Sequence, residues 1–85
     1  MKIDYSKIKL NAEEKKLLKS NYNHLETAAK HDYSLPLYQR DLIALNDLYI
    51  KYINKQGQNI SCRTCVLRLL KSLFLLGEAT GAFKK

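Results

Sequence analysis

The sequence predicts an all-α fold, a compact bundle of three helices built from a single domain over residues 1–85. Three stretches each repeat apolar residues at spacings of three and four, the period of an amphipathic helix. No two stretches read as strands that could pair, and no internal repeat is visible. With only three Gly and one Pro, the chain has few points at which a helix can be interrupted. Two connections are enough to join the three helices.

The first helix is expected over about residues 12–30, preceded by a short N-terminal arm or extra turn at 1–10. Asn11 with Glu14 three positions later forms a capping-box pattern, which satisfies free N–H groups at a helix start. One side of this segment carries the polar residues, and the other carries Leu17, Leu18, Tyr22, Leu25, Ala28 and Ala29. Ordinary amphipathic packing explains this pattern fully.

The second helix is expected over about residues 36–55, because Pro36 is tolerated in a first helical turn and Gly57 suits the position just past a helix. Ser34 or Asp32 is expected to cap it. Its apolar residues cover a broad face: Tyr38, Leu42, Leu45, Leu48, Tyr49, Tyr52 and Ile53. Short connections of about five to six residues on either side favour antiparallel neighbours.

The third helix is expected over about residues 62–80, with Ser61 as its cap and either Gly77 or Gly81 as its end. It is apolar on nearly every side, although Arg68 and Lys71 interrupt it. Such a helix must be the central element of the core, or it must bury a second face against another molecule. The residues of that candidate interface are Leu69, Leu70, Leu73, Phe74 and Leu76.

The net charge of +7 is concentrated in the last third of the chain, where residues 51–85 carry seven cations against Glu78 alone. Residues 21–50 are weakly acidic by contrast. A cationic surface favours phosphate-bearing or acidic partners. We therefore expect RNA or a nucleoprotein complex as the partner. The candidate contact residues combine cations with neighbouring aromatic rings and are Lys51, Lys55, Arg63, Arg68, Lys71, Tyr49 and Tyr52.

Two simpler interpretations of these residues stay open. Tyr49 and Tyr52 suit core positions with their hydroxyls at the rim, and the lysines then form a solvated face. Arg68 and Lys71 either face solvent or meet acids of the same chain, such as Asp41 or Asp47. A helix that reads bases in the major groove needs a polar recognition surface, and the third helix is too apolar for that role.

Cys62 and Cys65 have the spacing of a redox dithiol or of one half of a zinc site. The thioredoxin type of dithiol follows a strand in a βαβ unit, and none is predicted here. Zinc would need four ligands, with His24 and His31 completing the set. A disulfide between two subunits is a further alternative. The simplest interpretation is two buried thiols that fill gaps at a helix start, with no metal and no cofactor.

Other functional classes find little support in the sequence. No paired carboxylates, nucleophile with base, or glycine-rich phosphate loop is present, so an enzyme is not expected. The longest apolar stretch, residues 66–76, holds 11 residues with Arg68 and Lys71 inside it. A bilayer span needs roughly 20 apolar residues, so we expect no membrane contact. We also find no signal peptide, and we expect a cytoplasmic protein.

The segment Ser-Cys-Arg-Thr-Cys-Val-Leu-Arg-Leu-Leu-Lys at residues 61–71 resembles small uncharacterised proteins of phages and mobile elements in Bacteroidota-type bacteria. The likeness covers roughly residues 45–76: a tyrosine-rich helix, a short turn with asparagine, then Cys-x-x-Cys-Val-Leu before a leucine-rich helix. This chain departs from the pattern by continuing into residues 77–81. The resemblance implies a phage origin and no defined activity.

Taken together, these features predict a small basic binding protein without catalytic activity that acts on a nucleic acid or nucleoprotein complex. By analogy with phage proteins of this size, the complex could be a host-defence nuclease guided by RNA, which would make the chain an anti-CRISPR protein. The first alternative is an interaction or assembly protein, a virion component or homodimer that uses the apolar face of the third helix. The second is a small zinc-binding module.

Overall fold

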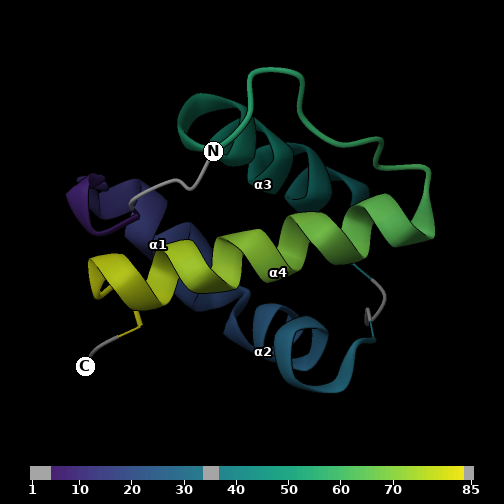
Figure 1. Ribbon diagram of the computed structural model, residues 1–85, viewed down its shortest axis with the longest axis horizontal. Helices are drawn as coiled ribbons and strands as arrows, with labels where there is room; N and C mark the ends of the chain where they lie inside the picture. Colours follow the sequence, from purple (N-terminus) through teal and green to yellow (C-terminus); the bar gives the residue numbers. More distant parts are fainter. Residues whose placement is uncertain (1–4, 34–36, 84–85) are drawn as a thin grey trace.

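The structure is a computed structural model that describes residues 5–33 and 37–83. Figure 1 shows helices packed around one long central helix. Their bounds are η1 (a 3-10 turn) Tyr5–Lys7, α1 Ala12–Ser20, α2 Tyr22–His31, α3 Gln39–Tyr52 and α4 Arg63–Thr80. Within the described residues there is no strand, so the all-α prediction is confirmed. Residues 5–33 and 37–83 form four α-helices, so the expected count of three was too low.

The expected helix 12–30 is two helices, because Asn21 interrupts it. The side-chain amide of Asn21 donates to the carbonyl of Leu17 at 3.0 Å. Its backbone N–H is shared between the carbonyls of Leu17 and Leu18 at 3.3 and 3.2 Å. An asparagine that bonds local backbone groups competes with helix continuation. Asn21 is buried at this junction, and α2 leaves α1 in a new direction (Figure 1).

The connection from α2 to α3 also differs from expectation. Asp32 does not cap α3; it ends α2 in the left-handed conformation with φ 56°, which aspartate tolerates better than most residues. Ser34 and Pro36 lie outside the described residues. Tyr38 is the N-terminal cap of α3 and makes no capping bond through its side chain. The helix ends at Tyr52, so the expected range 36–55 was too long at its C-terminal end.

Residues 53–62 run back along α3, so that α3 and α4 point in the same direction (Figure 1). The Asn46 side chain holds this segment against α3. Its amide donates to the Gln58 carbonyl at 3.1 Å and its oxygen accepts from the Gln58 N–H at 2.9 Å. Gly57, with φ +65°, sits against Ile50 with no room for a Cβ. The prediction of antiparallel neighbours was wrong for α3 and α4, because residues 53–62 run back along α3 before α4 begins.

The bounds of α4 agree with the expected 62–80 to within one residue, but its capping residue does not. Cys62, and not Ser61, is the N-terminal cap, and its sulfur accepts from the Cys65 N–H at 3.4 Å. Gly81 ends the helix at φ 77°. Gly77 lies inside the helix, where a Cβ would overlap the ring of Phe83. Close packing, and not termination, therefore explains Gly77.

Helix α4 is the centre of the core, which is the first of the two alternatives expected for it. Each of the other elements, η1 included, packs against it. The buried residues of α4 are Val66, Leu69, Leu70, Leu73, Phe74, Leu76 and Gly77. Leu18, Leu25, Leu45 and Leu48 meet them from the other helices. Burying a leucine stabilises by roughly 1.5–3 kcal/mol relative to leaving it exposed, so these contacts dominate the fold.

A remaining sector of α4 faces solvent, and Leu75 on it is 54% exposed. The sector also holds the charges of Arg68 and Lys71. In the described part of the chain, no helix combines the length and the apolar composition that crossing a bilayer requires.

Candidate nucleic-acid interface

The residues proposed to contact a nucleic acid do not form one surface. Lys51 and Tyr52 lie at the C-terminal end of α3, whereas Arg63 opens α4 at the opposite end of the molecule (Figure 1). The separation follows from the parallel course of α3 and α4, since the segment 53–62 carries the chain from one end to the other. The two groups therefore have to be described separately.

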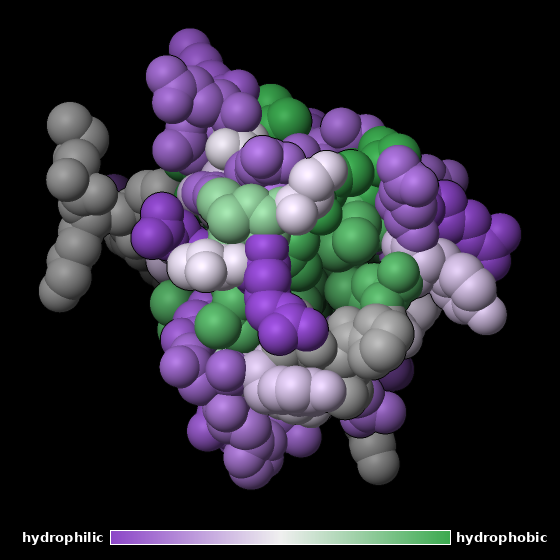
Figure 2. Space-filling model, turned by 90° about the vertical axis from the view of Figure 1, so that its right-hand side faces the viewer, coloured by the Kyte–Doolittle hydropathy of each residue, from purple (hydrophilic) through white to green (hydrophobic). Residues whose placement is uncertain are grey.

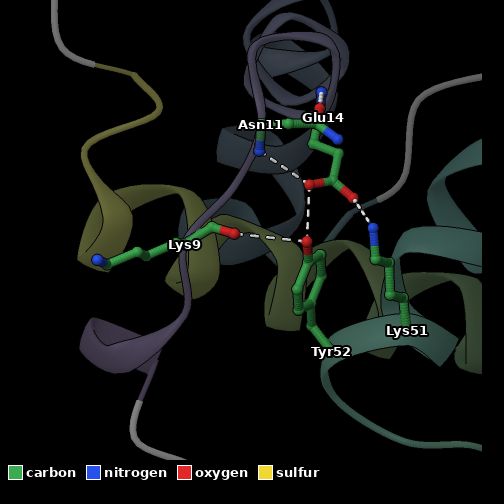
Figure 3. Close-up of polar contacts among 5 residues, drawn as sticks. All are labelled: Lys9, Asn11, Glu14, Lys51 and Tyr52. Carbon is green, nitrogen blue, oxygen red and sulfur yellow. Dashed lines mark hydrogen bonds and ion pairs between the residues drawn. The ribbon is translucent and has the colours of Figure 1, made fainter.

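The first group, the Glu14 end, consists of Asn11, Glu14, Lys51 and Tyr52 (Figure 3). One oxygen of Glu14 accepts from the Tyr52 hydroxyl at 2.7 Å and from the Asn11 N–H at 2.9 Å. The other oxygen meets Lys51 Nζ at 2.9 Å. The Asn11 side chain in turn accepts from the Glu14 N–H at 2.8 Å, so the predicted capping box is present. Glu14 thereby ties the start of α1 to the end of α3.

The surroundings of Glu14 favour its ionised form. Its side chain is only 13% exposed, and burial by itself opposes ionisation. The hydrogen bonds from Asn11, Tyr52 and Lys51 outweigh that penalty and lower the pKa of Glu14. The same carboxylate raises the pKa of Lys51 and of Tyr52. The charge of Lys51 is thus balanced within the chain and serves the fold.

Tyr49 is a core residue and offers no ring to a base. It is buried, and its hydroxyl accepts from the Gln58 amide at 3.0 Å. Lys55 is exposed in the segment that follows α3. Of the candidates at this side of the molecule, Lys55 is the one without an ion pair to a carboxylate of the described residues.

The second group, the Arg63 surface, consists of Arg63, Arg68 and Lys71 on α4 together with Tyr33 from the end of α2. At about 100° per residue, Arg63 and Arg68 lie roughly 140° apart on the helix circumference with Lys71 between them, so the three cations span a broad sector of α4. Arg63 and Arg68 are exposed. No carboxylate within residues 5–33 or 37–83 pairs with either arginine.

Lys71 pairs with Asp32, and neither Asp41 nor Asp47 is its partner. Both alternatives considered for these cations occur: Arg68 faces solvent, and Lys71 meets an acid of the same chain, which is Asp32 at the end of α2. The pair is open to water, with the two side chains 42% and 72% exposed. An exposed ion pair contributes only about 0–1 kcal/mol, so a phosphate can replace Asp32 at little cost.

Tyr33 is an aromatic residue of this surface that the sequence analysis did not select. It is 56% exposed. With Asp32, Arg63 and Leu67 it lines a hollow of about 160 Å³. Figure 2 looks onto this end of the molecule, and apolar side chains show between polar ones there. The helical spacing of Tyr49 and Tyr52 favoured those two tyrosines in the prediction. The signal for Tyr33 is its place in a connection between helices, because connections lie at the protein surface.

The four residues considered as zinc ligands are not assembled into a site. Cys62 and Cys65 are half-buried free thiols at the start of α4. His24 and His31 both lie on α2. Across residues 5–33 and 37–83, no three side chains of metal-binding type lie close enough to hold an ion. His24 instead borders a hollow beside Asp41 and Tyr38, and its Nδ1 is buried without a hydrogen bond.

The leucines considered as a partner interface are all inside the fold. Leu69, Leu70, Leu73 and Leu76 have no exposed surface, and Phe74 is 6% exposed. Phe74 stacks with Tyr22 and Phe83, with ring centroids 6.1 and 5.6 Å apart. Both apolar sides of α4 are therefore covered by the chain's own helices. None of these five residues is available to a partner in this fold.

Comparison of the chain with protein-family models, with curated proteins and with solved structures finds no match.

Proposed function

We propose that this chain is a non-enzymatic RNA-binding protein and that the Arg63 surface is its contact. The observation that carries the proposal is the pairing of two exposed arginines, unpaired by any described carboxylate, with an exposed tyrosine beside Arg63. Of the other cationic residues predicted from the sequence, Lys51 pairs with Glu14, Lys71 pairs with Asp32 at this surface, and Lys55 lies apart from it. The excess positive charge of residues 51–85 supplies the long-range attraction.

The chemistry of the surface suits a single strand. The guanidinium groups of Arg63 and Arg68 present forked N–H donors that match phosphate oxygens. Tyr33 offers a ring on which an unpaired base can stack, worth about 1–3 kcal/mol for each stacked base. A duplex groove is the poorer partner, because α4 is enclosed by other elements on most of its sides and cannot enter one.

The target in this proposal is RNA held in a nucleoprotein complex of the host, with an RNA-guided defence nuclease as the example. The resemblance to small phage proteins supports this setting, in which the chain acts in the host cytoplasm. The cations then contact the sugar-phosphate backbone, so binding depends little on base sequence. The assembly alternative loses support, because the apolar residues on which it depended lie in the core.

The test is fluorescence anisotropy with a labelled single-stranded RNA of mixed sequence. Arg63→Gln and Arg68→Gln are each expected to weaken binding about fivefold, the effect of losing about 1 kcal/mol of phosphate contact. Tyr33→Ala is expected to weaken it by a similar factor through lost stacking. Lys19→Gln is the matched control, because Lys19 is exposed on α1 and its substitution removes the same single positive charge.

The salt dependence of RNA binding distinguishes direct phosphate contacts from long-range electrostatic attraction. Each arginine variant is expected to reduce the slope of log affinity against log salt concentration by about one, since each phosphate contact releases counterions. The control Lys19→Gln should leave that slope unchanged. Equal losses for Arg63→Gln, Arg68→Gln and Lys19→Gln would mean that only total charge matters, and binding that is indifferent to salt would exclude the proposal.

A further inference from the structure

The start of α4 carries two thiols that the proposed RNA contact does not use. Cys62 caps the helix, and the Val66 N–H bonds to the Cys62 carbonyl at 2.9 Å, so the first turn is complete from Cys62 onward. Residues three apart in a helical turn have Cα atoms about 5 Å apart. Disulfides need roughly 4.4–6.8 Å. The two sulfurs can therefore be joined without unwinding α4.

We propose that Cys62 and Cys65 form a thiol–disulfide exchange site that reacts with small-molecule disulfides, with Cys62 as the attacking thiol and Cys65 as the resolving thiol. The two roles follow from the positions in the turn. The Cys62 sulfur is the N-terminal cap of α4 and accepts the Cys65 N–H of the first turn at 3.4 Å. Cys65 lies one turn further along α4 and does not occupy the capping position.

The electrostatics of the turn agree with this division. The Cys65 thiol and the Cys65 N–H both bond to the Cys62 sulfur and lower the pKa of Cys62, with Arg68 adding to the effect. The same contact with Cys62, together with burial, raises the pKa of Cys65. A helix N-terminus stabilises a thiolate in the same direction. Both side chains are only partly buried, so a small disulfide can reach them.

The reaction balances with a disulfide of the glutathione class as oxidant. The Cys62 thiolate attacks one sulfur of that disulfide, the old S–S bond breaks, and one small thiolate leaves and takes up the proton lost by Cys62. The Cys65 thiol then loses its proton and attacks the Cys62 sulfur of the mixed disulfide. The second small thiolate leaves with that proton. Two protein thiols are oxidised by two electrons, and one disulfide is reduced to two thiols.

The experiment equilibrates the full chain with reduced and oxidised glutathione and measures the species by mass spectrometry after acid quenching. The expected result is one transition to a monomer that has lost two hydrogen atoms. Cys65→Ser should instead accumulate the mixed disulfide on Cys62, because the resolving thiol is gone. Cys62→Ser keeps a capping oxygen and should react more slowly with oxidised glutathione than Cys65→Ser does.

Two outcomes would overturn the proposal. One is a chain that stays fully reduced, or that forms only disulfides between two molecules, across the whole range of glutathione ratios. The other is equal reaction rates for the two serine variants, since the fold would then make no distinction between the thiols. A separate measurement compares the reduction potential of the Cys62–Cys65 pair in the folded chain with that in the chain unfolded in urea. The folded chain should have the less negative potential, because its first turn stabilises the reduced form.

Discussion

The Glu14 end and the Arg63 surface use similar residues for opposite purposes. Lys51 and Tyr52 meet one carboxylate that is 13% exposed, with contacts of 2.9 and 2.7 Å. Arg63 and Tyr33 lie beside a small hollow and stay open to water. A cation beside a tyrosine is therefore not a binding signature by itself. What decides its role is whether another part of the chain brings a carboxylate to it.

The comparison also shows where binding energy is available. Charges at the Glu14 end are already compensated, so a phosphate there would have to compete with Glu14 and lose the bonds that join α1 to α3. At the Arg63 surface, the one described carboxylate that would compete with a phosphate is Asp32, whose ion pair with Lys71 is exposed. The surface with weaker internal contacts is the one suited to a partner.

The largest expected effect comes from opening a cavity in the core beneath the helix that carries the Arg63 surface. Leu73→Ala should lower the free energy of unfolding by about 3 kcal/mol, because Leu73 is fully buried and its loss leaves a cavity. Leu75→Ala is the matched control on the same helix and should change it by less than about 0.5 kcal/mol. Urea denaturation measures both. Equal effects would mean that the apolar face of α4 is not covered as described.

The next effect tests the Glu14 end directly. Glu14→Ala should lower the free energy of unfolding by about 2 kcal/mol, since it removes bonds to a charged acceptor and half of the capping box. Glu13→Ala, in the same helical turn but exposed, should cost about 0.5 kcal/mol through the helix dipole. If the two variants melt together in thermal denaturation, the link between α1 and α3 is not made by Glu14.

Stability should also fall in acid, and Glu14 should account for part of the fall. The folded chain lowers the pKa of Glu14 and of Glu26. A carboxyl with a lowered folded pKa stabilises above its unfolded value of about 4.3 and loses that contribution as pH drops through the folded pKa. Denaturation midpoints from pH 7 to pH 3 should therefore decline, and Glu14→Gln should show a shallower decline than the parent chain.

Much of the fold was predictable, because it depends on local patterns. The α4 bounds, the capping box at Asn11 and the burial of the leucines follow from spacing and residue type. The division at Asn21 was missed because the apolar spacing continues across it, whereas the bend depends on one side-chain bond to Leu17. Asparagine can bond local backbone groups or point to solvent, and the sequence alone does not show which of the two Asn21 does.

The candidate site was less predictable, because it depends on contacts far apart in the chain. The sequence places Lys51, Tyr52 and Arg63 close together, and the parallel course of α3 and α4 separates them. The partners of Lys51 and Lys71 are Glu14 and Asp32, 37 and 39 residues away. Pairings over such distances follow from tertiary packing, so local composition could identify the cations but not which of them remain open.

The most direct measurement compares RNA affinity for two double variants of equal charge loss. Arg63→Gln with Arg68→Gln removes two cations from the Arg63 surface, and Lys51→Gln with Lys55→Gln removes two from the α3 side, each checked by its melting curve to be folded. The account predicts a loss of about 25-fold for the arginine pair, two contacts of about fivefold each, and at most about twofold for the lysine pair. Equal losses, or a larger loss for the lysine pair, would contradict it.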